Sequence, residues 1–91
     1  MPTAAVQGDS EPLDFDSVHW QGDLEAQLVE RGTTRLHCQG EQLSNCVSAL
    51  MEYLVTPIDV GFQLFYPVIE RIERRGEQWV ITLILRELVG E

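Results

Sequence analysis

The adjacent pair His37-Cys38 is the first place in the sequence where residue types capable of covalent chemistry stand together. A cysteine nucleophile needs a general base within hydrogen-bond reach. Side chains alternate in character over residues 34–38, a pattern that predicts a strand. Successive side chains of a strand point to opposite faces of the sheet. We therefore expect Cys38 in the core and His37 on the other face, and the pair does not predict a catalytic site.

The second thiol, Cys46, lies on an apolar stripe with Leu43, Val47 and Leu50. Burial raises the pKa of a thiol and makes it unreactive. A metal site built from His37, Cys38 and Cys46 would lack a fourth ligand and the short spacing that zinc sites use. The sequence therefore predicts two free, buried thiols, no metal site and no cofactor. A thiol-dependent enzyme or redox protein that uses Cys38 or Cys46 remains an alternative.

Carboxylates also gather near the start of the chain, at Asp14, Asp16 and Asp23. A calcium loop requires a fixed ligand spacing, a glycine at its sixth position and a closing glutamate, and these residues do not meet it. The glycines are scattered singly, and none belongs to a phosphate-binding loop, a dinucleotide-binding motif or a nucleophile elbow. We interpret the aspartates as a solvated acidic stretch, and we predict no catalytic residues.

Two features predict a surface for protein contacts. Four arginines converge if the last part of the chain forms a hairpin, and they alternate with glutamates: Arg71, Arg74, Arg75 and Arg86. Pairing of opposite charges across the hairpin is the ordinary explanation, and a contact patch is the functional one. Trp20 follows His19 near the acidic start of the chain and is the aromatic residue that we least expect to be buried. A half-exposed tryptophan often anchors an interface.

Composition narrows the classes of partner. The chain has 91 residues with 15 acidic side chains against 6 basic ones, a net charge of −9. The first thirty residues contain seven acids and no base. Nucleic-acid backbones and anionic membranes bind basic surfaces, so we expect neither as a partner. An acidic mimic that occupies the groove of a nucleic-acid-binding protein is an alternative function.

Targeting signals are not apparent in the sequence. The longest unbroken apolar run has three residues, whereas a membrane-spanning helix needs about 20. No base precedes Arg31, and a secretory signal has a positively charged start. Together with only two cysteines, these features predict a cytoplasmic protein.

The clearest predicted elements are a helix and a strand. Apolar residues recur at three- and four-residue steps over residues 41–55, which predicts a helix that ends before Pro57. Residues 78–88 are rich in β-branched and apolar side chains on both faces, which predicts a strand in the middle of a sheet. Charged residues flank its apolar segment, as expected for a strand prone to aggregation.

Two further segments fit either element type. Residues 62–74 fit a helix that begins at Pro67, but we prefer a strand that forms a hairpin with residues 78–88 through Gly76. Residues 23–31 fit a short helix capped by Asp23 and ended by Gly32. They also alternate in character, and we prefer a hairpin with residues 33–38.

These elements predict an α+β fold: a two-layer domain with one main helix, about 41–55, packed on a small antiparallel sheet in the order β-β-α-β-β. We expect residues 1–12 to form a flexible acidic N-terminal segment and residues 13–91 to form the single domain. A core of this size is marginally stable. We therefore expect a small non-enzymatic module that binds protein, either a larger partner or itself as a homodimer.

Overall fold

The computed structural model describes residues 12–87, of which 46% lie in strands. The predicted flexible segment, except Pro12, and the last four residues lie outside the described residues, so the fate of that segment stays a prediction. Neither helix within residues 12–87 has the length and apolar character needed to cross a membrane.

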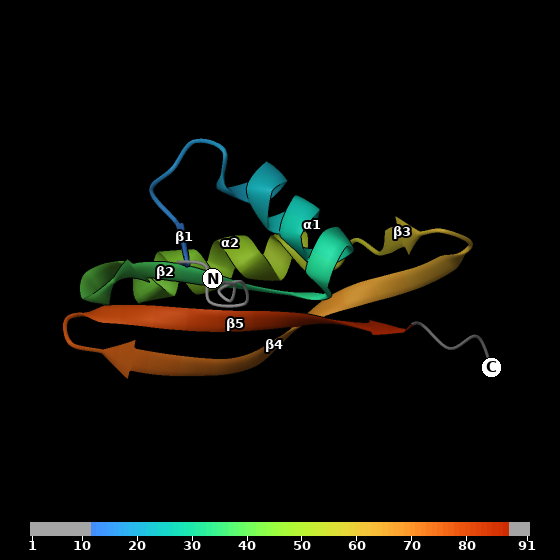
Figure 1. Ribbon diagram of the computed structural model, residues 1–91. Helices are drawn as coiled ribbons and strands as arrows, with labels where there is room; N and C mark the ends of the chain where they lie inside the picture. The colour runs from blue at the N-terminus through green and yellow to red at the C-terminus, as the bar shows by residue number, and fades with distance from the viewer. Residues whose placement is uncertain (1–11, 88–91) are drawn as a thin grey trace, which may run out of the picture.

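Five strands form one curled sheet, and two short helices lie on the same face of it (Figure 1). The strand order across the sheet is β1-β2-β5-β4-β3. The elements in chain order are β1 (Leu13–Asp14), α1 (Trp20–Arg31), β2 (Thr33–Gln39), a single 3-10 turn η2 (Gly40–Gln42), α2 (Leu43–Tyr53), β3 (Ile58–Val60), β4 (Gln63–Arg75) and β5 (Gln78–Glu87).

The predicted fold class is wrong. Instead of one main helix on a small antiparallel sheet in the order β-β-α-β-β, the chain forms a mixed half-barrel with two helices of similar length. The sheet is mixed because β1 runs parallel to β2, with Leu13 opposite Leu36. All other neighbouring strands are antiparallel.

The main error lies in residues 23–31, which belong to the helix α1 and not to a hairpin. Leu24 and Leu28 are both fully buried, whereas Ala26 between them is exposed. Residues four positions apart share a helix face, so the apolar alternation that suggested a strand contains a helical pair. Gly32 ends α1 at φ 81°, and its N–H donates to the Leu28 carbonyl at 2.8 Å. A left-handed residue of this kind is the usual end of a helix.

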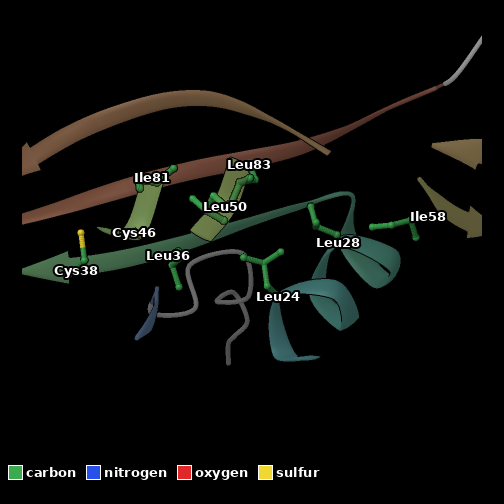
Figure 2. Packing of buried hydrophobic residues seen from close by; sticks show 9 residues of the cluster. All are labelled: Leu24, Leu28, Leu36, Cys38, Cys46, Leu50, Ile58, Ile81 and Leu83. Atoms are coloured by element: carbon green, nitrogen blue, oxygen red, sulfur yellow. The ribbon is translucent and has the colours of Figure 1, made fainter. Parts of the chain in front are cut away.

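The helix predicted over residues 41–55 is present but shorter, as η2 followed by α2. Its buried residues, Cys46 and Leu50, face Ile81 and Leu83 of β5 (Figure 2). Leu24 and Leu28 of α1 belong to the same cluster, so both helices share one core. Burial of this shared face, and not helix propensity, accounts for the stability of two helices of only 11 and 12 residues.

The strand interpretation of residues 62–74 is confirmed, since β4 and β5 form the long hairpin of the sheet. Gly76 turns the chain at φ 65°, a conformation that favours glycine. The predicted central strand is also confirmed, because β5 lies between β2 and β4. The ladder between β4 and β5 is irregular between Ile69 and Arg71, which makes Glu70 a bulge.

The register of the ladders sorts the side chains between the two faces of the sheet. Leu36, Ile81 and Ile72 lie opposite one another on the face that the helices cover. His37, Val80 and Glu73 occupy the next register and therefore lie on the other face. Arg71 and Arg75 share this other face with Glu73, whereas Arg74 lies with Ile72 on the face that the helices cover.

Candidate interaction surface

The outer edge of β4 is the feature of the fold that is most open to a partner. One side of β4 pairs with β5 from Phe65 to Arg75. The other side pairs with β3 only at Gln63–Phe65. Among the described residues, no strand covers the outer side of residues 66–75. An uncovered strand presents backbone N–H and C=O groups to which another strand can bond.

Charged side chains dominate this free edge. Residues 66–75 contain three of the six arginines of the chain and two glutamates: Glu70, Arg71, Glu73, Arg74 and Arg75. Three bases and two acids give this segment a charge of +1, whereas the whole chain has −9. The edge is therefore less acidic than the molecule as a whole, so it repels a second acidic molecule less than the average surface does.

Ion pairs on β4 run along the strand. A guanidinium nitrogen of Arg71 lies 3.2 Å from one carboxylate oxygen of Glu73, and one of Arg75 lies 3.5 Å from the other. The Arg71 and Arg75 side chains are 59% and 61% exposed. Exposed pairs of this kind contribute little to stability. The predicted pairing of arginine and glutamate across the hairpin is therefore replaced by pairing within one strand, which leaves these side chains accessible.

Arg74 is held differently, at the turn end of the strand. Its Nε donates to the carbonyl of Gly76 at 3.0 Å, and its guanidinium lies 5.8 Å from the ring centre of Trp79. A cation above an aromatic ring is attracted by the electrons of its face. These contacts direct the Arg74 guanidinium towards β5 and the turn.

The predicted arginine patch is only partly formed. Arg71, Arg74 and Arg75 lie together at the turn end of β4. Arg86 lies opposite Tyr66 at the far end of the hairpin, whereas Arg75 lies opposite Gln78 near the turn. The hairpin thus separates Arg86 from the other three. The interface role predicted for these residues is not tested by their positions.

Ile72 is a surface residue that the sequence interpretation missed. It is 41% exposed, although its register partner Ile81 is fully buried. A signal for it was available, because Ile72 is the single aliphatic residue within the run of charged residues 70–75. An exposed isoleucine at the middle of a charged strand edge gives that edge an apolar centre.

Trp20, the other predicted interface residue, begins α1 and is half-buried against the core. Its ring centre lies 5.5 Å from that of Phe15, with the two planes tilted by 50°. The tryptophan therefore joins the start of α1 to the segment after β1. It does not lie on β4 with the arginines, so the two predicted interface features belong to different parts of the molecule.

The two thiols lie in the core, as the sequence predicts: Cys38 is 3% exposed and Cys46 is fully buried. Burial raises the pKa of Cys46 to about 12, and the neighbouring Cys38 adds to the shift. Burial also raises the pKa of Cys38. Since the thiolate is the nucleophile, both groups are held in their unreactive form near neutral pH. His37 lies on the opposite face of β2 from Cys38, as predicted, and does not serve as its base.

A cavity of about 300 Å³ lies on the face of the sheet away from the helices, lined by Pro12, His37, Arg75, Gln78 and Val80. The Nδ1 atom of His37 is buried and has no hydrogen-bond partner in the part of the chain that the structure describes. The described lining residues include an imidazole, a guanidinium and an amide side chain, which offer polar contacts. Among residues 12–87, no group of three histidine, cysteine or acidic side chains is placed to hold a metal ion.

Comparisons with known proteins identify no relative of this chain. No family model matches it, and neither a curated protein nor a solved structure matches it.

Proposed function

We propose that the protein is a small non-enzymatic binding module whose working surface is the free edge of β4. The module binds protein by strand addition, in which an extended segment lies beside residues 66–75 and bonds to the backbone. One observation carries this proposal: β5 pairs with one side of this strand, whereas within residues 12–87 no strand pairs with the other side of residues 66–75.

The surroundings of the edge support the same conclusion. Backbone hydrogen bonds supply affinity in strand addition, and side chains that alternate between the two faces supply selectivity. At β4 these side chains are an exposed aliphatic residue, Ile72, between charges of both signs. A thiol-dependent enzyme needs a reactive thiolate, and burial with raised pKa values keeps both thiols protonated, which argues against that alternative. Two free thiols also suit the reducing cytoplasm, which we propose as the compartment.

Hydrogen exchange tests the proposal. Extended peptides selected from a displayed library for binding to the intact chain should slow amide exchange within residues 66–75 and leave α1 and α2 unchanged. The same measurement on the chain alone, at increasing concentration, tests whether a second copy protects the edge. Protection confined to the helices, or no protection of residues 66–75 under either condition, would contradict the proposal.

A matched pair of variants separates edge binding from general destabilisation. Ile72→Lys places a charge at the centre of the edge, a device that blocks strand pairing. Val29→Lys makes the same change on α1, at a residue of similar exposure, 43% against 41%. We expect the first variant to abolish protection of residues 66–75 and the second to preserve it.

A further inference from the structure

We propose that the strand received by the β4 edge is β4 of a second copy, so that two chains form a symmetric dimer through antiparallel pairing centred on Ile72. The inference rests on the proposed function and names its partner. Two features carry it: the order of charges along the free edge and the exposure of the residue at its centre.

Two-fold symmetry fixes which residues meet. In an antiparallel pair, positions equally distant from the axis on either side lie opposite one another. With the axis at Ile72, this residue meets the partner's Ile72. Arg71 then meets the partner's Glu73, and Glu70 meets the partner's Arg74. Every charged residue within two positions of the axis thus faces a charge of the opposite sign, and symmetry forms each pair twice.

Other positions of the axis lack this complementarity. Residues directly opposite one another in an antiparallel pair point to the same face of the sheet, so the two-fold axis can move only in steps of one whole residue. An axis at Glu73 places Glu73 opposite the partner's Glu73, and axes at Arg71 and Arg74 each place an arginine opposite its own copy. Of these four positions, only Ile72 avoids contacts between like charges, which cost binding free energy.

Positions nearer the start of β4 are disfavoured by the backbone. Glu70 is the bulged residue, and the ladder is irregular there. Pro67 has no N–H to donate to a second strand. Bulges, prolines and charges are the features that protect an edge from indiscriminate pairing. Here they restrict pairing to a short stretch, and the order of the charges selects one register within it.

The resulting dimer joins two five-stranded sheets into one continuous sheet. Ile72 lies on the face that the helices cover, so pairing packs the two isoleucines together and covers a side chain that is 41% exposed in one copy. Arg71 and Glu73 already lie 3.2 Å apart within a single strand. Their side chains therefore need only small rotamer changes to exchange this contact for two contacts across the dimer axis.

Mass measurement of the intact chain gives the first test. A pair of strand edges is a small interface, so we expect reversible association, with the mass rising on concentration from 10.3 kDa towards twice that value. Light scattering or sedimentation equilibrium measures this directly. A monomer at every concentration would overturn the self-pairing, while peptide protection of residues 66–75 would still support strand addition to another protein.

Two charge reversals test the register. Arg71→Glu places like charges at both equivalent contacts of a homodimer, and so does Glu73→Arg, so each variant alone should dimerise on the order of a hundredfold more weakly. A mixture of the two brings opposite charges together again at both contacts. Equal amounts of the two variants should therefore form a heterodimer close to wild-type affinity. Loss of folding in either variant is monitored by circular dichroism and could not produce this recovery.

Arg75→Glu is the matched control. It makes the same charge change and breaks the 3.5 Å contact with Glu73, but in the proposed register Arg75 meets the partner's Ile69. Its dimerisation should stay within a few fold of wild type. Association that is equally sensitive to Arg75→Glu and Arg71→Glu, or a mixture of the two reversed variants that stays monomeric, would overturn the register centred on Ile72.

Discussion

The hydroxyl of Thr34 donates a hydrogen bond of 2.6 Å to the side-chain Oε1 of Gln27, which joins β2 to α1. Thr34 is 4% exposed and is the buried polar residue of the described chain. A buried hydroxyl without a partner would cost free energy, so this bond allows a threonine to lie beside Leu36 in an otherwise apolar row.

Loss of the hydrogen bond between Thr34 and Gln27 should destabilise the protein. Thr34→Val keeps the shape of the side chain and removes the donor, and should lower the free energy of unfolding by about 1 kcal/mol. Chemical denaturation monitored by circular dichroism measures the change. Thr82→Val is the matched control on the other face of β5, where a β-branched apolar residue suits the strand and should leave stability within about 0.5 kcal/mol of wild type. Equal losses in both variants would contradict a special role for the bond.

Replacing Gly32 and Gly22 by alanine should change the stability of the protein in opposite directions. Gly32 has φ 81°, so Gly32→Ala strains the backbone and should destabilise the protein by about 1 kcal/mol, although nothing lies within 4 Å of the added methyl group. Gly22 lies within α1, also with open space around it. Gly22→Ala should stabilise the protein by about 0.5–1 kcal/mol, because alanine is the better helix former. Thermal unfolding separates the two effects, and the same sign for both would count against the helix and its glycine end.

Tyr53 is expected to limit stability at high pH. Its buried hydroxyl has no hydrogen-bond partner among residues 12–87. Burial, with a smaller contribution from Glu25, raises its pKa from 10.0 to about 12. The folded protein therefore holds a proton that the unfolded chain loses, and stability falls as pH rises from about 10 to about 12. Tyr53→Phe should remove this share of the loss. At pH 7 it should stabilise the protein by about 1 kcal/mol, since phenylalanine buries no unpaired hydroxyl.

Urea unfolding at a series of pH values tests that prediction. The difference between wild type and Tyr53→Phe should be constant below pH 10 and should grow above it. A difference that does not change with pH would show that the Tyr53 hydroxyl reaches water in the folded state.

The thiols are predicted to react only when the protein opens. Cys46 is fully buried with its pKa raised to about 12, and the pKa of Cys38 is also raised. Alkylation by iodoacetamide at pH 8 should therefore be slow for the native chain and rapid in denaturant. Mass spectrometry counts the modified cysteines over time. Rapid native modification of Cys46 at the rate of a free peptide would contradict its burial.

How much of this fold the sequence could predict depends on whether a local pattern fits one element type. Residues 78–88 combine β-branched residues with apolar side chains on both faces, and only a central strand accommodates that pattern. Residues 41–55 have a helical period and a proline just beyond them. Both elements are present in the structure, within a few residues of their predicted ends.

The prediction failed where one pattern fits two structures. Leu24, Ala26 and Leu28 satisfy a period of two, and Leu24 and Leu28 also satisfy a helical period, so the choice depended on tertiary contacts that no local rule supplies. The parallel contact of β1 with β2 is a second example, since Leu13 and Asp14 are too few to carry a pattern. The predicted fold class was wrong because these short segments decide whether the sheet is mixed and how many helices cover it.

The candidate surface was predictable in its residue types and not in its geometry. The arginines of residues 71–75 were identified from the sequence, but the distance of Arg86 from them follows only from the register of the hairpin. The exposure of Ile72 depends on the absence of a strand beside β4 among the described residues, and this is a property of the complete sheet order.

The place of β5 in the sheet also governs the order in which the molecule can be assembled. β2 ends at Gln39, and the strand that pairs with it begins only at Gln78. During synthesis on the ribosome, α1, β2 and α2 therefore emerge before the surface that buries them exists. Their apolar side chains stay accessible to chaperones and proteases until β5 leaves the exit tunnel.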